Sequence, residues 1–180
     1  MSDSITPFQL LRQIADTSRS AASQLPAQKE IRALWSGIGF TVAGRQYVAP
    51  MNEITEILSV PGYTRLPGVK PWVNGVANVR GRLVPIIDFV SFLGEHSNAT
   101  LKTKRILVID YEDMINGIVV DSVEGMQHFP VDTFSGEVAP EIPESLQPFS
   151  DGHYILNNKV WSVFSLQRMM VSDEFMAVAV

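Results

Sequence analysis

The N-terminal residues alternate between apolar and polar positions with the period of an α-helix. The small and apolar positions that share one helical face are Leu11, Ile14, Ser18, Ala21, Ala22 and Leu25. Thr6 and Gln9 form a T-x-x-Q capping box in front of this pattern, and Pro26 ends it. We therefore predict a helix over residues 5–25 and a second, short helix over residues 28–33. The thin apolar face of the first helix packs either on the rest of the chain or on a partner.

From Trp35 onward the pattern changes to short apolar runs separated by glycine, proline and asparagine, which is typical of β-strands joined by tight turns. Residues 37–50 predict a hairpin that turns at Ala43–Arg45. Arg80–Gly81 and Asn157–Asn158 are predicted to turn two further hairpins. The other predicted strands are residues 54–60, 76–79, 82–87, 105–110, 117–121, 125–129, 153–156 and 160–164.

Three kinds of segment interrupt the strand pattern. Pro71 is predicted to open a helical turn that Gly75 ends. Residues 89–93 and 165–171 are predicted to form short helices, and residues 130–152 a long loop, since this stretch holds several prolines and acidic residues.

Two stretches of the strand region, residues 40–57 and 107–126, share the order strand, polar turn, strand, bend, strand. Short strands at close spacing, with glycines at the corners, predict small barrels rather than one open sheet. Pro85 lies inside a predicted strand, which indicates an edge position or a bulge. The predicted fold class is therefore mainly β, with two small barrels that share a core and an N-terminal helical extension.

The net charge of −5 is unevenly distributed along the chain. Residues 1–100 hold 9 Lys/Arg and 7 Asp/Glu, giving +2, whereas residues 101–180 hold 5 and 12, giving −7. This balance disfavours broad nucleic-acid binding, and the acidic half is either solvated or orients the protein against a partner. No apolar run reaches the roughly 20 residues that span a bilayer. Because the N-terminus also lacks a secretory pattern, we expect a cytoplasmic protein without direct membrane insertion.

Residue types that carry catalysis or bind metals are sparse. The chain has no cysteine, which excludes disulfides, thiolate metal sites and a cysteine nucleophile. His96, His128 and His153 lie far apart, so we expect no metal site and no cofactor. The chain has no phosphate-binding glycine loop and no nucleophile-elbow motif. An active site assembled from distant residues of a barrel stays open as an alternative.

An oligonucleotide-binding barrel is the competing hypothesis from another class of protein. Such a barrel needs cations interleaved with aromatic side chains on one face. The residues that could supply them are Arg65, Lys70, Arg80, Arg82, Tyr63 and Trp72. Because the remaining chain is acidic, we expect no nucleic-acid partner, and strongly salt-dependent oligonucleotide binding would overturn this expectation.

Several motifs follow one another along the strand region. They are GFTVAGRQYVAP, I-T-E-I at Ile54–Ile57, T-R-L-P at Thr64–Pro67, G-V-A-N-V-R-G at Gly75–Gly81, V-P-I-I-D-F at Val84–Phe89 and G-I-V-V-D at Gly117–Asp121. In this order they resemble the CheW-like family of chemotaxis coupling proteins over residues 36–171. LPAQKEIRALWSGIGF and PGVKPWVNGVANVRGRLVPIIDF resemble, more narrowly, the PilI-type adaptors of type IV pilus twitching motility, and the N-terminal extension fits that subgroup.

The resemblance implies two five-stranded SH3-like barrels in a CheW-like domain over residues 35–175, after an extension over residues 1–34. It implies a non-enzymatic adaptor that joins the regulatory domain of a histidine kinase to the cytoplasmic tip of a methyl-accepting receptor. Such an adaptor lies in the cytoplasm, at the inner membrane through receptor arrays. Twitching motility is the implied pathway, with flagellar-type chemotaxis as the alternative.

The resemblance also implies two sets of docking residues. The kinase contacts are Ile54 and Glu56, and the receptor contacts are Gly75, Arg80, Arg105, Gly117 and Met126. Arg105 departs from the small apolar residue that the family usually has at this position.

The residues themselves suggest a mechanism for Glu56 and Arg80. A carboxylate and a guanidinium in one barrel are predicted to form a partly buried, bidentate pair. Breaking such a pair from one side costs on the order of 3–5 kcal/mol if it is fully buried. The pair either only stabilises the barrel, or it holds Arg80 against the receptor. Arg82 is predicted to be solvated.

Overall fold

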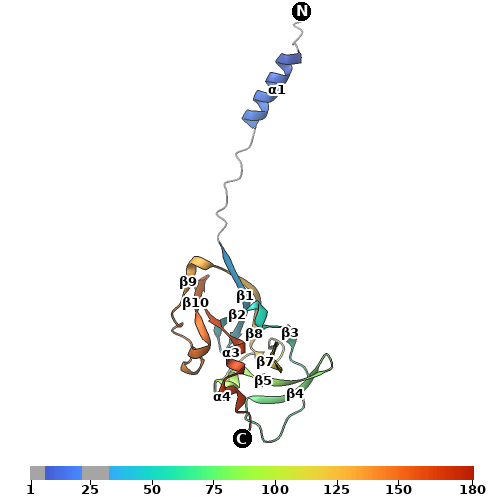
Figure 1. Cartoon of the computed structure of the whole chain (residues 1–180), viewed down its shortest axis with the longest axis vertical. Coiled ribbons are helices and arrows are strands. Elements are labelled where there is room, and N and C mark those ends of the chain that lie inside the picture. The colour runs from blue at the N-terminus through green and yellow to red at the C-terminus, as the bar shows by residue number, and fades with distance from the viewer. Residues whose placement is uncertain (1–6, 22–32) are drawn as a thin grey trace, which may run out of the picture. The chain divides into compact units, whose positions relative to one another are not determined.

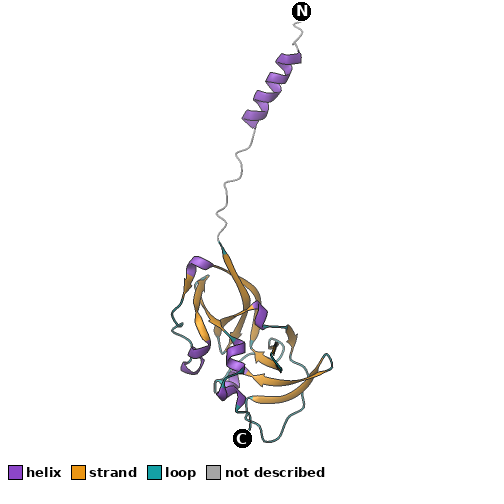
Figure 2. Ribbon diagram, in the orientation of Figure 1, coloured by secondary structure: helices purple, strands orange, loops and turns teal. Residues whose placement is uncertain are grey.

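The structure, a computed structural model, describes residues 7–21 and 33–180. The chain divides into two compact units, residues 1–32 and residues 33–180. The first unit contains the helix α1 (Pro7–Ala21), drawn in purple near the N-terminus in Figure 2. Its large apolar side chains Phe8, Leu10, Leu11 and Ile14 are each more than half exposed. The predicted helix ends at residues 5 and 25 lie outside the described residues, as do residues 28–32 of the second predicted helix, and Ala33 is not helical.

The second unit is built from strands. They are β1 (Leu34–Val42), β2 (Arg45–Pro50), β3 (Glu56–Ser59), β4 (Val73–Val79), β5 (Arg82–Asp88), β6 (Arg105–Tyr111), β7 (Met114–Val120), β8 (Ser122–Pro130), β9 (Phe134–Ser135), β10 (Ser150–Leu156) and β11 (Lys159–Phe164). The short helices are α2 (Phe89–Phe92), α3 (Leu166–Met170) and α4 (Asp173–Met176), with single 3-10 turns at Met51–Glu53, Val131–Thr133 and Glu144–Phe149.

The strands form two sheets, which Figure 1 shows as two adjacent groups. Sheet A has the order β8-β1-β2-β11-β10-β9, and sheet B has the order β3-β6-β7-β5-β4. Most neighbours are antiparallel, but β11 runs parallel to β2, and β5 runs parallel to β7. Sheet A has six strands rather than the predicted five, because Phe134–Ser135 adds a short strand inside the segment that was predicted to be a loop.

Three clusters of buried side chains show how the two sheets share one core. One cluster, which includes Phe129 and Trp161, fills sheet A alone. A second, which includes Val84 and Ile86, fills sheet B alone. The third and largest combines sheet A residues such as Tyr47 with sheet B residues and with side chains from all three short helices. The predicted fold class, mainly β with two barrels sharing a core, is therefore confirmed.

Gly75 does not end a helical turn, as the sequence pattern had predicted, and this prediction is wrong. It lies inside β4, which begins at Val73, next to a shift in the register with β5. Its φ of +144° is a conformation that side chains rarely adopt, so the glycine reflects a bulge in a strand and not the end of a helix.

Pro85 lies in an interior strand at a position where its missing N–H costs no hydrogen bond. It faces Val76 across β4 and β5, and Val76 directs both of its backbone hydrogen bonds to Thr64 on the other side. On its own other side, pairing between β5 and β7 begins only at Ile86. A proline is therefore tolerated without an edge position.

Removing residues 1–34 is expected to leave the second unit folded. Among the described residues, the three buried clusters contain none before Trp35, so the free energy of unfolding should change by about 0.5 kcal/mol or less. Urea denaturation of residues 35–180 and of the full chain, followed by circular dichroism, measures this difference. Removal of residues 1–39 takes away Trp35 and six of the nine residues of β1, so this shorter chain should unfold at a clearly lower urea concentration. Loss of the cooperative transition in residues 35–180 would show that this fold needs the extension. The domain boundaries at residues 34 and 175 stay predictions.

Candidate functional site

Three of the predicted site residues lie in one row across sheet B. Pairing runs from Glu56 to Val108, from Val108 to Gly117, from Gly117 to Ile86 and from Ile86 to Gly75. Directly paired residues on neighbouring strands have side chains on the same face of a sheet. Strand pairing thus brings Glu56 and Gly117, which are 61 positions apart in the sequence, into the same row.

Arg80 sits at the tip of the β4–β5 hairpin in a conformation that arginine seldom adopts. Arg80 and Gly81 have φ values of +50° and +83°, as in a two-residue turn of the mirror-image type. Asn78 accepts a hydrogen bond from the Gly81 N–H at 2.8 Å, which fixes this turn. Asparagine, aspartate and glycine are preferred at this position of such a turn, so the arginine is there against the backbone preference.

The guanidinium of Arg80 does contact the carboxylate of Glu56, but not in the predicted geometry. Arg80 Nε lies 3.0 Å from Glu56 Oε2. The Arg80 side chain is 74% exposed and that of Glu56 is 23% exposed. Within the described residues the contact is a charge pair without an aligned hydrogen bond, since Glu56 Oε2 accepts none. The predicted bidentate geometry is therefore wrong, and only the Glu56 side of the pair is partly buried. An ion pair with such an exposed arginine contributes about 1 kcal/mol or less to the free energy of unfolding.

Gly75 and Gly117 are both covered by their own chain. A Cβ built on Gly75 would lie 2.1 Å from the carbonyl oxygen of Thr64. A Cβ on Gly117 would lie 3.0 Å from Ile86 Cδ1. The absence of side chains at both positions thus permits close packing inside sheet B.

The other predicted site residues lie in different surroundings. Ile54 is half-buried and packs on the shared core. Arg105, at the start of β6, donates from Nη1 to the backbone carbonyls of Lys102 and Lys104, both at 2.8 Å. Met126 is 49% exposed on β8 of sheet A, opposite Ile38, so the strand pairing does not bring it into the sheet B row.

Sequence reasoning missed a buried carboxylate beside the predicted kinase residues. Glu53 is 7% exposed and accepts hydrogen bonds from Ser165 Oγ at 2.9 Å and from the Gln167 N–H at 3.1 Å. It thereby joins the segment before β3 to the start of α3, across 112 positions in the sequence. No local pattern signals such a partner.

Asp88 explains the end of the V-P-I-I-D motif. Its Oδ1 accepts the Ser91 N–H at 3.0 Å and caps α2, and its Oδ2 lies 3.3 Å from Lys104 Nζ. The capping signal was present in the sequence, because an aspartate directly precedes the predicted short helix.

Two of the three histidines each contact one neighbouring group. His128 Nδ1 is 2.7 Å from Ser36 Oγ, and His153 Nδ1 is 2.9 Å from the Glu137 carbonyl. Burial raises the pKa of Tyr47 to about 12, so its phenol stays neutral at ordinary pH. Over residues 7–21 and 33–180, no three histidine or acidic side chains are grouped so that they could hold a metal ion.

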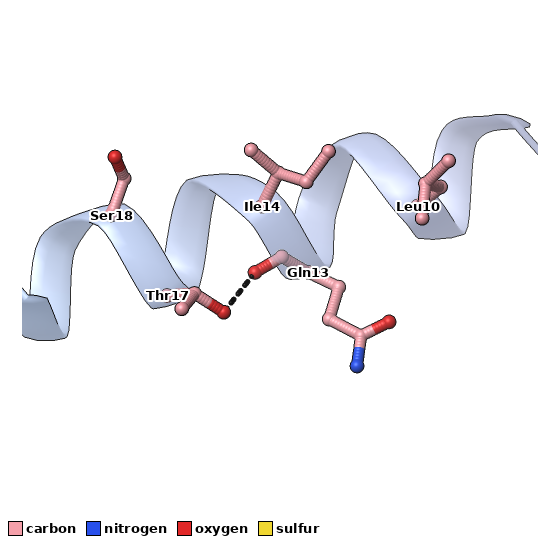
Figure 3. Close-up of a pocket in the computed structure, with 5 residues that line it drawn as sticks. All are labelled: Leu10, Gln13, Ile14, Thr17 and Ser18. Atoms are coloured by element: carbon pink, nitrogen blue, oxygen red, sulfur yellow. Dashed lines mark hydrogen bonds between the residues drawn. The ribbon is translucent and has the colours of Figure 1, made fainter.

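A shallow concavity lies on α1. It is lined by Leu10, Gln13, Ile14, Thr17 and Ser18, all from the one helix. Figure 3 shows Ile14 and Ser18 on one side of the helix, while Thr17 donates to the Gln13 carbonyl at 2.7 Å. None of the helices in the described part of the chain is long and apolar enough to cross a membrane.

Comparisons with known proteins agree over most of the chain. Residues 36–174 match the CheW-like domain family. The protein PilI of Pseudomonas aeruginosa is 51% identical over 180 residues, which is all of both chains. The chemotaxis protein CheW of Helicobacter pylori is 33% identical over 100 residues, 56% of this chain and 61% of that protein. The scaffolding protein TtCheW of Thermoanaerobacter tengcongensis has a similar fold, with a TM-score of 0.64 and 19% identity over 77% of this chain and 94% of its own.

Proposed function

The chain belongs to the CheW-like domain family, and from this premise we propose that it is an adaptor that couples a methyl-accepting receptor to a chemotaxis-type histidine kinase in type IV pilus twitching motility. The assignment to the twitching-motility pathway rests on the 51% identity with PilI over the whole chain, which includes the N-terminal extension. The CheW relative from Helicobacter pylori aligns with only 56% of this chain. We infer a scaffold without catalysis, which acts in the cytoplasm at the inner membrane through receptor arrays.

We propose that the kinase regulatory domain docks on the β3 edge of sheet B, around Ile54 and Glu56. β3 is an edge strand whose only partner within sheet B is β6. Ile57, the neighbour of Glu56, is 39% exposed there. An apolar side chain exposed on an edge strand is suitable to become the buried centre of an interface.

We propose that the receptor tip docks over Arg80 at the hairpin tip, with Arg105 and Met126 as further side-chain contacts. Gly75 and Gly117 are buried, so we propose that they contribute to this surface through the close packing of the strands beneath it. Support comes from the positive φ of Arg80, since an arginine held in a disfavoured conformation and left 74% exposed suits a role outside the fold.

Titration calorimetry of the chain against the kinase regulatory domain tests the adaptor role. Ile57→Asp is expected to weaken binding at least about tenfold, because it puts a charge at the apolar centre of the interface. Ile57 is preferable to Ile54, because Ile54 packs on the shared core and an aspartate there would also destabilise the fold. Ile155→Asp is the matched control, since Ile155 is 57% exposed on sheet A.

Saturable 1:1 binding that Ile57→Asp weakens and Ile155→Asp leaves unchanged would support both the adaptor role and this kinase face. Equal affinities of the two variants would reject the face. If the folded wild-type chain binds neither the kinase domain nor the receptor tip, the adaptor role is rejected.

A further inference from the structure

The cations of the second unit, residues 33–180, which we call the β unit, divide into paired and unpaired ones. Five are in ion pairs: Arg45 with Glu95, Arg80 with Glu56, Arg82 with Asp110, Lys104 with Asp88 and Arg168 with Asp151. Arg105 donates instead to backbone carbonyls. Four cations remain among residues 33–180 whose side chains have neither a carboxylate partner nor a backbone carbonyl partner: Arg65, Lys70, Lys102 and Lys159.

Two of these four unpaired cations line one pocket. Arg65 and Lys70 lie five positions apart in the segment that leads into β4. Together with Leu66 and Asn74 they line a cavity of about 250 Å³. Leu66 is 43% exposed, so the pocket combines two uncompensated positive charges with an apolar side chain at the surface. A guanidinium and an ammonium in this setting are suited to bind carboxylates.

The backbone that carries this pocket is fixed at both ends. Thr64 and Val76 exchange two hydrogen bonds, of 2.8 Å and 2.9 Å. At the other end, the Lys70 N–H donates to the Val178 carbonyl at 2.9 Å, and the Val180 N–H donates to the Gly68 carbonyl at 3.2 Å. The C-terminal residues thus pair with the segment before β4. A loop held in this way loses little conformational entropy when it binds a partner.

Trp72 anchors the segment between Thr64 and β4 through aromatic contacts in the core. It is 8% exposed and stacks on Phe175 of α4 at 5.7 Å, with Phe92 edge-on at 5.2 Å. The C-terminal residues 175–180 that complete this support lie beyond the part of the chain that matches the family, which ends at residue 174. Hydrogen bonds and aromatic packing therefore both hold the segment that lines the pocket.

The pocket adjoins the proposed receptor surface. A Cβ built on Gly75 would lie 3.0 Å from the Cα of Arg65. We propose that Arg65 and Lys70 bind acidic side chains of the receptor's cytoplasmic tip, as a second anchor near the start of β4, whereas Arg80 follows the end of this strand. This inference rests on the proposed function, and it names a charge complementarity that the family motifs do not contain.

The test measures binding of a soluble receptor-tip fragment to the full chain by calorimetry at low salt. The double variant Arg65→Glu/Lys70→Glu is expected to lower the affinity at least about tenfold, because each cation becomes a repelling charge. At 0.5 M salt the difference should shrink to about threefold or less, since screening shortens the reach of exposed charges to a few ångströms. Binding of the kinase domain should stay unchanged.

The matched control is Lys102→Glu/Lys159→Glu, which makes the same change of net charge at the other two unpaired cations. Its receptor affinity should stay within about twofold of wild type. Equal affinities of the two double variants would overturn the inference and leave the adaptor role intact. A wild-type chain that binds neither the receptor tip nor the kinase domain would instead remove the proposed function, and this inference with it.

Discussion

Replacing Gly75 with alanine is expected to destabilise the β unit by about 3–5 kcal/mol, as the sum of a backbone term and a packing term. The backbone term arises because a φ of +144° is almost closed to residues with a Cβ. The packing term arises because the new Cβ would lie 2.1 Å from the Thr64 carbonyl oxygen, a backbone atom that cannot rotate away. Urea denaturation measures the change in the free energy of unfolding.

Two other glycines separate these terms. Gly44 has a φ of +80° with open space around it, so Gly44→Ala should cost about 1 kcal/mol from the backbone alone. Gly62 has open space and no positive φ, so Gly62→Ala should change stability by about 0.5 kcal/mol or less. If Gly75→Ala is no more destabilising than Gly44→Ala, the close approach of Thr64 does not constrain this strand.

The Gly75 prediction matters for function because Thr64 is directly followed by Arg65. A Cβ on Gly75 would push the segment that carries Arg65 away from β4, since the displaced atom belongs to the backbone. Mutations of this glycine should therefore weaken receptor binding indirectly, and they cannot by themselves identify Gly75 as a contact.

Reversal of the charge at Arg80 is expected to have the largest effect on receptor binding. Arg80→Glu should weaken the affinity for the receptor tip about 30-fold or more, the loss typical of an arginine at the centre of an interface. Stability should fall by only about 1 kcal/mol, because the Arg80 side chain is 74% exposed and makes no aligned hydrogen bond to Glu56. Calorimetry with the receptor tip and urea denaturation of the same samples measure the two effects separately.

Arg82→Glu is the matched control for this variant. Arg82 lies on the same hairpin, is 57% exposed and is paired with Asp110 in place of Glu56. The prediction that Arg82 is solvated thus missed its ion pair with Asp110. Arg82→Glu changes the net charge of the chain by the same amount as Arg80→Glu. If Arg80→Glu and Arg82→Glu weaken the receptor equally, the effect is one of overall charge. Unchanged binding by a folded Arg80→Glu variant would remove Arg80 from the docking surface.

Glu56→Gln distinguishes the two roles left open for the pair. The substitution removes the carboxylate charge but keeps the size of the side chain and leaves Arg80 in place. Reduced receptor binding by Glu56→Gln would mean that the pair positions the guanidinium, whereas unchanged binding would mean that Arg80 acts alone. The single contact of 3.0 Å between Nε and Oε2 leaves the rest of the guanidinium available to a partner.

Local sequence determined the elements whose stability depends on neighbouring residues. The helical period of residues 7–21, the turns at Arg80–Gly81 and Asn157–Asn158, and the short helix after Asp88 were all predicted and are present. Each relies on contacts within a few positions, such as the Asp88 cap on Ser91. The ordered motifs also indicated the family, and the structure shows that N-V-R-G and V-P-I-I-D encode a turn and a helix cap.

Only the tertiary structure decided how distant segments meet. The bulge at Gly75, the two-residue strand β9 and the buried Glu53 beside Ser165 all depend on partners from another part of the chain. The same holds for the separation of paired from unpaired cations, because Arg82 forms its ion pair only where β5 and β6 place it against Asp110. Periodicity and turn signals report local backbone preference, whereas these features arise from the closure of loops between strands, which no pattern along the chain records.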